Sequence, residues 1–404
     1  MAVLFGPNAA GKSNFIDAVQ ALSRVGTCRT LSDALSEPIR GYPVEAFSFP
    51  PGGLAELLGK DKAQFELSSL VDANEEVKDE KATGGITDGK SYKYAYDIKV
   101  GIHPSTGILG MDAESLTCLN DKWKPKGSPL IELYQGELHI RRRVKAARPR
   151  KERAGINYSL LSDVHINGEL YRDFERCRGE LSGWRTYYLD PRSAMRSARP
   201  PSEVSDIGTR GENIAPFLYR LSDERPKYFE SVKRALRSLI PSVEDVEVEL
   251  DKKRAELDIQ VRQNGTSFSS RIISEGTLRV LALCAIAVNP WSGSLLAFEE
   301  PENGVHPRRL ELIVELLVSM AIEQKRQIIV TTHSPHLCGA VFRHAQSHPD
   351  DIALLRVGQD ENGTSVQRVD TEQPLFKDTE IAKGLSSGTE DGIFEALMLR
   401  GLDE

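Results

Sequence analysis

The sequence predicts an α/β fold with a mixed, mainly parallel sheet at its core. Residues 2–5 form an apolar run typical of a buried strand, and apolar residues then recur at helical spacing through residues 13–24. Two later apolar runs, residues 295–298 and 327–332, lead into polar residues, as strands of a parallel sheet do beside a ligand crevice. A chain of 404 residues with 40% hydrophobic content is long enough for one large core plus an insertion.

A phosphate-binding loop lies between the first strand and the first helix. The segment matches G-x-x-x-x-G-K-S, in which backbone N–H groups and the helix start hold the phosphates of a nucleotide. The lysine reaches the β- and γ-phosphate oxygens, and the serine hydroxyl ligates Mg²⁺. Because spacing, strand and helix agree, ATP binding is favoured over a chance glycine-rich turn. The ATP-binding residues are Gly6, Pro7, Asn8, Ala9, Ala10, Gly11, Lys12, Ser13 and Asn14.

Three ionisable side chains are expected beside the γ-phosphate. Glu299 and Glu300 end the second strand, where adjacent carboxylates are costly unless they are used. We expect Glu299 to help hold Mg²⁺ and Glu300 to act as general base for the attacking water. His333 follows the third strand and can bond the γ-phosphate or that water. The alternatives are a solvated acidic loop and an ordinary hydrogen-bonded histidine.

A second anion site is predicted where a buried, alanine-rich helix begins ahead of residues 278–288. Free N–H groups at a helix start bind anions, so this segment can contact a γ-phosphate. Alternatively, Ser274 at the start of the segment only caps the helix. The order of the motifs along the chain is what favours the phosphate contact. The segment consists of Ser274, Glu275, Gly276 and Thr277.

The order of these motifs resembles that of the ATP-binding-cassette (ABC) ATPases, and within them the RecF/SMC branch. Residues 273–279, 298–307 and 331–335 look like those of AAA ATPases related to the ATPase half of OLD-family proteins. Residues 187–191 and 210–213 agree with this resemblance, which covers most of the chain. It implies a P-loop NTPase fold, an ABC-type head with an antiparallel β-subdomain and a helical insertion. No long coiled coil is expected, because no heptad run is sustained.

The resemblance also implies a head-to-tail homodimer that holds two ATP molecules. Each ATP would lie between the phosphate loop of one subunit and the signature segment of the other, which is residues 274–277. Glu299 matches the Mg²⁺-associated acid, Glu300 the catalytic glutamate and His333 the switch histidine, acting with Lys12. Asn303 matches the loop at the dimer interface.

Three features depart from the family pattern. Ala9 replaces the usual third glycine of the phosphate loop, and the signature is Ser-Glu-Gly-Thr rather than Ser-Gly-Gly-Gln. Relatives carry further strands ahead of the loop, whereas Met1 lies just before Gly6, so an exposed sheet edge and a smaller adenine pocket are expected. The Q-loop glutamine is not identified, and Gln64 and Gln135 are both candidates.

We expect three parts along the chain. Residues 1–140 form an N-terminal lobe with the phosphate loop and the β-subdomain. Residues 141–260 form a basic loop with an insertion of helices and strands. Residues 261–404 form a C-terminal lobe with the signature helix, the acidic strand and the switch histidine.

A basic cluster at residues 141–153 is the candidate nucleic-acid site. It can neutralise phosphates, or it can be only a solvated loop, since aromatic residues are lacking. Four further arginines, at 185, 192, 196 and 199, either extend this patch or serve the ATP interface. The basic residues are Arg141, Arg142, Arg143, Lys145, Arg148, Arg150, Lys151 and Arg153.

Composition limits the remaining function classes. A net charge of −7 argues against a wholly basic nucleic-acid coat, and five scattered cysteines without a C-x-x-C pair indicate a reduced cytoplasm. No apolar segment approaches the roughly 18 residues of a membrane span, so no membrane contact is expected. The chain after His333 is too short for the nuclease domain of OLD-type proteins. Its apolar ending, residues 393–399, either docks a partner or packs on its own lobe.

The resulting hypothesis is a Mg²⁺-dependent ATP hydrolase that acts as an ATP-driven dimerising switch. It would control a DNA or RNA transaction with a separate nuclease or toxin effector in prokaryotic phage defence. A RecF-like clamp for DNA repair or recombination is one alternative, and a non-hydrolysing nucleotide-sensing scaffold is another. The effector, the trigger and the type of nucleic acid are not specified by the sequence.

Overall fold

The computed structural model describes residues 1–37, 39, 41–75, 90–144, 148–360, 363–369 and 394. The chain forms two compact units, one of Met1–Ile16 with Arg185–Glu404 and the other of Asp17–Trp184. Helix α1 (Lys12–Val25) begins in the first unit and continues into the second. The units therefore divide the chain at other positions than the three parts expected from the sequence.

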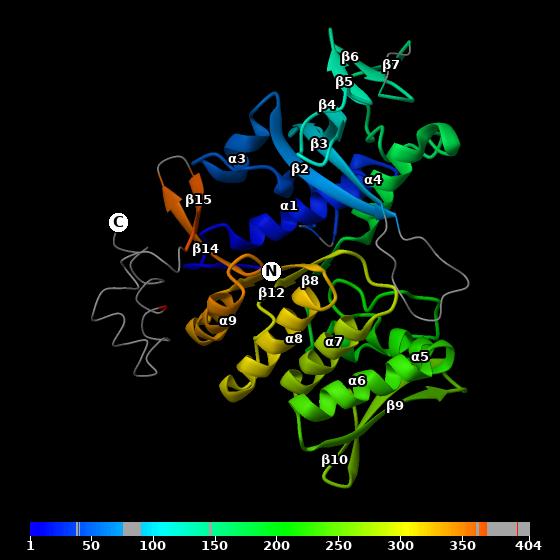
Figure 1. The fold of residues 1–404 in the computed structure, drawn as a ribbon, viewed down its shortest axis with the longest axis vertical. Coiled ribbons are helices and arrows are strands. Elements are labelled where there is room, and N and C mark those ends of the chain that lie inside the picture. The colour runs from blue at the N-terminus through cyan, green and yellow to red at the C-terminus, as the bar shows by residue number, and fades with distance from the viewer. Residues whose placement is uncertain are drawn as a thin grey trace. The chain divides into compact units, whose positions relative to one another are not determined.

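A six-stranded mixed sheet lies at the centre of the first unit (Figure 1). Neighbouring strands from β14 to β8 pair in parallel, and β15 pairs antiparallel with β14. Strand β1 lies between β13 and β14, so the strand that leads into the phosphate loop is interior, and the edge strands of this sheet are β15 and β8. The strand order is β15 (Gly363–Arg368), β14 (Ala353–Asp360), β1 (Ala2–Phe5), β13 (Gln327–Thr332), β12 (Leu295–Glu299) and β8 (Arg185–Tyr187).

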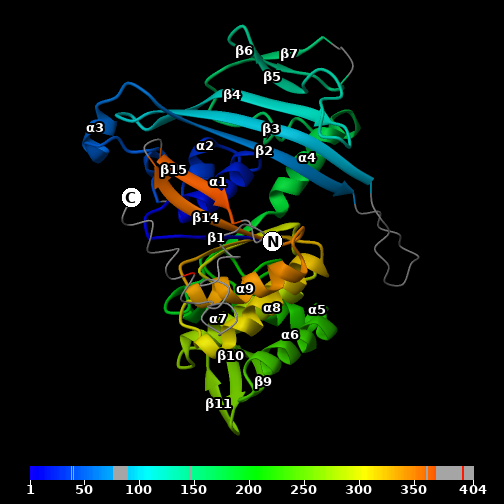
Figure 2. The same ribbon diagram turned by 60° about the vertical axis from the view of Figure 1, so that its left-hand side comes forward.

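Helices beside this sheet bury most of the apolar residues of the unit. In α7 (Glu275–Val288) every residue from Thr277 to Ala287 is buried, as in a helix that is covered on all sides. Helices α7, α8 (Leu310–Ile322) and α9 (Pro335–Ser347) lie side by side in both views (Figures 1 and 2). Phe394 is buried against Phe5 and Phe342, at ring-centroid distances of 5.7 and 5.9 Å. This residue of the apolar ending thus packs on its own unit, and the rest of residues 393–399 lie outside the described residues.

Two further helices of the first unit pack on α7, and a small antiparallel sheet contacts those two helices. Helices α5 (Ile214–Glu224) and α6 (Pro226–Leu239) contact α7, and they lie within residues 141–260, where an insertion of helices and strands is expected. Strands β9 (Val243–Asp251), β10 (Glu256–Gln263) and β11 (Thr266–Ser269) form an antiparallel sheet.

An antiparallel sheet forms the second unit and corresponds to the predicted β-subdomain (Figure 2). Side chains of β3 alternate between buried and partly exposed, which puts Tyr94, Tyr96, Ile98 and Val100 in the core. Helix α4 (Arg172–Gly183) packs on β2, and the short helices α2 (Leu31–Leu35) and α3 (Gly53–Leu58) precede the sheet. Residues 76–89, between β2 and β3, lie outside the described residues. The strand order is β2 (Ala63–Glu75), β3 (Lys90–His103), β4 (Ile108–Leu119), β5 (Ile131–Tyr134), β6 (Glu137–Ile140) and β7 (Arg150–Arg153).

A buried carboxylate ties β4 to the segment after β7. Glu114, which is 1% exposed, accepts hydrogen bonds from the hydroxyls of Tyr96 and Ser159 at 3.0 and 2.6 Å. It also accepts from the backbone N–H groups of Leu160 and Leu161 at 2.7 and 3.1 Å. Burial raises the pKa of the Glu114 carboxyl, and these four donors oppose the shift. One side chain therefore satisfies two backbone donors that no helix or strand would pair.

Replacing Glu114 with alanine should destabilise the second unit by about 3 kcal/mol, because the buried N–H of Leu160 loses its acceptor and that of Leu161 keeps only the Ser159 hydroxyl, at 3.0 Å. Urea unfolding measures the loss, and hydrogen exchange at the amides of Leu160 and Leu161 should accelerate. The same substitution at exposed Glu66 on β2 is the control and should cost less than about 1 kcal/mol. Amides that stay protected in Glu114→Ala would mean that other contacts order this segment.

Candidate nucleotide site

The phosphate loop between β1 and α1 has a backbone that few residue types adopt easily. Gly6, Ala9 and Gly11 have φ angles of 153°, 63° and 100°. A Cβ atom on Gly6 would overlap the carbonyl oxygen of Val357, and one on Gly11 would overlap the hydroxyl of Thr364. Glycine is thus required at both positions by conformation and by space. Ala9 adopts a left-handed conformation that costs about 1–2 kcal/mol for a residue with a Cβ atom.

The end of strand β14 and the start of β15 hold this loop. Gln359 donates from Nε2 to the carbonyl oxygen of Ala9 at 2.9 Å. Thr364 fills the space beside Gly11. The contact joins residues 350 positions apart, and no local pattern in the sequence indicates it.

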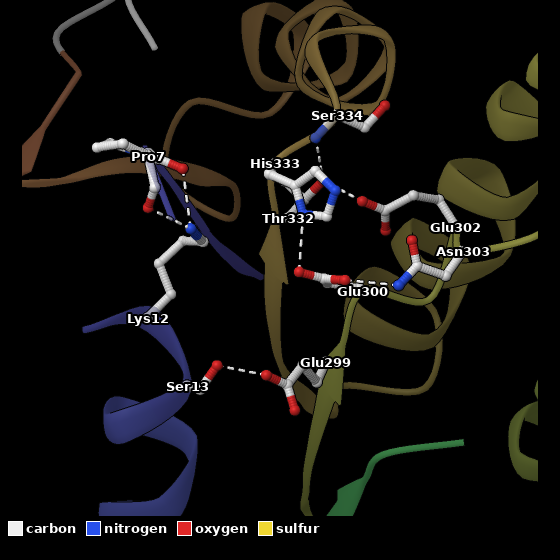
Figure 3. Close-up of polar contacts among 11 residues, drawn as sticks. Pro7, Lys12, Ser13, Glu299, Glu300, Glu302, Asn303, Thr332, His333 and Ser334 are labelled. Atoms are coloured by element: carbon white, nitrogen blue, oxygen red, sulfur yellow. Dashed lines mark hydrogen bonds and ion pairs between the residues drawn. The ribbon is translucent and has the colours of Figure 1, made fainter. Parts of the chain in front are cut away.

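Lys12 and Ser13 start helix α1 and face the end of β12 (Figure 3). The ammonium of Lys12 donates to the carbonyl oxygens of Gly6 and Pro7, both at 2.8 Å. Burial lowers the pKa of this ammonium, and the carboxylates of Glu300 and Glu299 oppose the shift. The Ser13 hydroxyl donates to Oε1 of Glu299. A hydroxyl and a carboxylate at one point fit Mg²⁺, which takes few protein ligands and completes its shell with phosphate and water.

Glu300 is held on several sides at the end of β12 (Figure 3). Its φ of 44° is uncommon for a residue with a side chain, and such strain is concentrated at functional sites. Its backbone N–H donates to Thr331 at 3.0 Å. One carboxylate oxygen lies 2.7 Å from Nδ1 of His333, and the other accepts from the amide of Asn303 at 2.5 Å. The carboxylate and the imidazole remain 26% and 46% exposed, so both can reach a ligand.

The structure thus brings together the side chains that the sequence assigned to hydrolysis. Glu300, Asn303 and His333 form one hydrogen-bonded set, and Ser13 and Glu299 form another. A carboxylate with both oxygens oriented can accept a proton from water, which is the chemistry of a general base.

A buried acid, Glu302, follows Glu300 by two residues, and no pattern in the sequence indicates it. Oε1 of Glu302 accepts from the hydroxyl of Thr332, while Oε2 has no hydrogen-bond partner among the described residues. Burial raises the pKa of the Glu302 carboxyl, and neighbouring Glu300 raises it further. Arg279 of α7 is also buried, and its Nε has no partner within the described chain. Burial lowers the pKa of this guanidinium, and Glu302 opposes the shift.

The signature segment starts α7 as predicted. Ser274 caps the helix, since its hydroxyl oxygen accepts from the N–H of Thr277 at 3.1 Å. A Cβ atom on Gly276 would lie 2.5 Å from the carbonyl oxygen of Gly304, so the helix start packs directly on the loop that follows Glu300. The contact with a partner's phosphate stays a prediction.

Two of the four additional arginines support this helix start. Arg192 donates to Glu275 at 2.8 Å, and Arg196 donates to the carbonyl oxygens of Arg271 and Ile273, both at 2.8 Å. These contacts favour a role beside the signature segment rather than an extension of the basic patch. Two motifs that agree with the family resemblance also meet here, because Asp190 pairs with Arg210 at 3.1 Å. These motifs are residues 187–191 and 210–213.

The basic cluster of residues 141–153 lies in the second unit, and several of its cations are already paired. Arg141 contacts Glu132 at 2.6 Å, Arg150 contacts Glu152 at 2.6 Å, and Lys151 contacts Glu137 at 2.8 Å. Lys145 lies outside the described residues. Acids of the neighbouring strands β5 and β6 therefore lessen the positive charge that a nucleic-acid phosphate would meet.

Comparison with known protein families identifies the chain. It matches the family described as "AAA domain, putative AbiEii toxin, Type IV TA system" over residues 1–92 and 132–339. The chain belongs to this AAA family. The matched ranges include the phosphate loop, the signature segment, the acidic strand and His333, so the expected membership among AAA ATPases is confirmed. With the sheet order described above, the fold is that of an α/β P-loop NTPase.

One curated relative of this AAA protein is the "Retron Ec83 probable ATPase" of Escherichia coli. The two are 29% identical over 145 residues, which are 33% of this chain and 24% of the relative. The match thus spans about a quarter of the relative's length.

Solved SMC head domains are also similar to this chain. The SMC head bound to the C-terminal winged-helix domain of ScpA has a TM-score of 0.47 and 11% identity, and the match covers 93% of this chain and 91% of that one. The SMC head from Thermotoga maritima has a TM-score of 0.36 and 16% identity, with coverage of 91% and 90%. None of the described helices has the length and apolar character needed to cross a membrane.

Glu302→Gln should stabilise the protein at alkaline pH and leave it unchanged at acidic pH. Burial raises the pKa of Glu302 in the folded protein above its unfolded pKa of about 4.3. The contribution of Glu302 to stability is therefore fully present below the unfolded pKa and is lost as pH rises through the folded pKa. Glutamine keeps the neutral form and still accepts from Thr332. The difference in unfolding temperature between variant and wild type should therefore grow with pH.

The matched control is Glu315→Gln at an exposed position on α8, where no such trend is expected. A constant or reversed difference for Glu302→Gln would mean that Glu302 is charged in the folded chain and is stabilised by Arg279.

Proposed function

We propose that this AAA protein is a Mg²⁺-dependent ATP hydrolase and that ATP drives its dimerisation. The observation that carries the proposal is the position of Glu300, a strained and partly exposed carboxylate held by His333 and Asn303. Its chemistry suits removal of a proton from water, and a phosphate loop ends at the same edge of the sheet. This pairing of a base with a phosphate-binding loop supports phosphoanhydride hydrolysis over nucleotide sensing alone.

Each side chain has one task in this proposal. The loop backbone and Lys12 bind the phosphates, and Ser13 with Glu299 holds Mg²⁺, which when bound neutralises charge on the β- and γ-phosphates. Glu300 accepts the proton of the attacking water. His333 donates from Nδ1 to Glu300, which leaves Nε2 to meet that water or the γ-phosphate.

The dimer is proposed because Asn303 is exposed and yet bonds the general base. A partner subunit that contacts the loop of Asn303 would also orient Glu300. Ile272, two residues before Ser274, is 70% exposed, which suits a surface that a second subunit covers. We propose that Ser274, Glu275, Gly276 and Thr277 meet the ATP held by the partner.

The biological role is proposed from similarity to other proteins. The relative that is named a retron ATPase supports a place in prokaryotic phage defence, where the ATP switch would act on a separate nuclease or toxin effector in the cytoplasm. We propose that the switch responds to a nucleic acid, either DNA or RNA.

Glu300→Gln should lower ATP hydrolysis by about 100-fold or more, because a general base contributes a factor of this size. With hydrolysis blocked, ATP and Mg²⁺ should convert monomers into stable dimers, which light scattering on a sizing column measures. Glu315→Gln, the same change on an exposed helix face, should behave as wild type. A Glu300→Gln mass that does not respond to ATP would contradict the dimerising switch.

Mixing two inactive variants tests whether the signature segment acts on the partner's ATP. Lys12→Ala disables the loop, and Ser274→Arg blocks the signature segment, so each homodimer should be inactive. An equal mixture should recover at most about a quarter of wild-type activity, since half of the dimers are heterodimers with one intact site, and less where that site depends on ATP at the other. If two correctly folded variants gave no recovery when mixed, Ser274 would act only within its own subunit as a helix cap.

A further inference from the structure

The turn between β4 and β5 presents an exposed tryptophan among lysines. Trp123 is 40% exposed, and Lys122, Lys124 and Lys126 beside it are all exposed. Asn120 orders the turn, because its side-chain oxygen accepts from the N–H groups of Lys122 and Lys124 at 2.9 and 3.1 Å. The backbone N–H of Trp123 also donates to Asn120 at 2.9 Å. The ring is therefore carried on a turn with a defined hydrogen-bond pattern.

The backbone at Trp123 is unfavourable for a large side chain. Its φ of 57° lies in the left-handed region, where glycine and asparagine are the usual residues. A bulky residue tolerates this conformation poorly, and exposed tryptophan gains little from burial. Glycine would fit this backbone conformation better than tryptophan. Neither the local conformation nor burial in the core of the unit therefore explains a tryptophan at this position.

A lysine on β3 fixes the orientation of the ring. The ammonium of Lys93 lies 4.6 Å from the centroid of the Trp123 ring, within the range of a cation–π contact. It also donates to the carbonyl oxygen of Asp121 at 3.3 Å. Asp121 is the single acid within residues 120–126, against three lysines. The basic cluster of residues 141–153 differs, since Arg141, Arg150 and Lys151 there are paired with acids.

We propose that this lysine–tryptophan turn, residues 120–126 with Lys93, binds single-stranded nucleic acid. Trp123 would stack on an unpaired base while the lysines meet the neighbouring phosphates, the combination that single-strand-binding proteins use. Bases of a duplex are stacked on one another and offer no such face. The inference names a contact for the nucleic acid of the proposed function and does not depend on the ATP-driven dimer.

An anionic membrane surface is the other partner with this chemistry, and the structure disfavours it. Interfacial binding needs a broad apolar face, whereas Trp123 is surrounded by charged residues and Pro125. Leu119, at the end of β4, is buried in the protein. One ring among lysines suits a base and its phosphates better than it suits lipid.

The test is fluorescence anisotropy of a labelled oligothymidylate with the full chain, across a series of salt concentrations. Trp123→Ala should weaken binding by about 10-fold or more, and Trp123→Phe should retain most of it, because base–aromatic stacking tolerates either ring. Changing Lys122, Lys124 and Lys126 together to glutamine should reduce the slope of log K against log salt by about 2–3. Tyr134→Ala, at an exposed aromatic position on β5, is the matched control and should bind as wild type.

Several results would overturn the inference. The inference is wrong if the wild-type protein does not bind the oligonucleotide. It is also wrong if Trp123→Ala binds the oligonucleotide as tightly as wild type. Tighter binding to duplex or to phosphatidylserine vesicles, with the same dependence on Trp123, would assign the turn to that partner instead. Circular dichroism and ATP hydrolysis of each variant establish that the fold and the nucleotide site are intact. If Glu300→Gln failed to dimerise while oligonucleotide binding stayed intact, the proposed ATP-driven switch would be wrong and the proposed binding by the turn would stand.

Discussion

The parallel register of three strands is the constraint on which the nucleotide site depends. Phe5 pairs with Thr332, and Glu299 pairs with Thr331, so β1, β13 and β12 end within one residue of one another. The residues that follow these ends are the phosphate loop, His333 and Glu300, and the loop comes from a segment far from the other two in the sequence. A shift of one residue in either pairing would turn a functional side chain to the other face of the sheet. The geometry of the candidate site is therefore a property of the sheet, and the chain between the strands is free to carry a second unit.

Several groups at this edge are unfavourable on their own. Ala9 and Glu300 have strained backbones with positive φ angles, Lys12 is buried, and Glu302 keeps one oxygen without a partner among the described residues. Burial of polar and charged groups costs free energy, which the apolar surroundings must offset. Helix α7 supplies much of this through its fully buried middle, and Val3, Phe298 and Val330 add the buried faces of the strands. The stable core thus supports a site that would not form in isolation.

The sequence predicted the elements whose signals are local. The strand, loop and helix of residues 2–24, the capped helix after Ser274 and the strands that end in Glu299 and Thr332 all follow from short patterns. Contacts between distant segments could not be predicted in this way. Examples are β14 beside β1, Gln359 on the phosphate loop, and Glu302 near Arg279. The ion pairs of residues 141–153 could not be predicted for the same reason, since the acids that pair with Arg141 and Lys151 belong to neighbouring strands.

The packing of α7 has a consequence for the proposed dimer. Gly276 touches the backbone of Gly304, and Arg279 lies in the electrostatic field of Glu302 and Glu300. The helix that would meet the partner's ATP therefore also supports the loop of the general base in its own subunit. Any movement of the signature segment on binding would be passed to Asn303 and Glu300 through rigid contacts rather than through solvent. Two sites linked in this way would not hydrolyse ATP independently, so a dimer with one empty site would have a differently oriented base at the other.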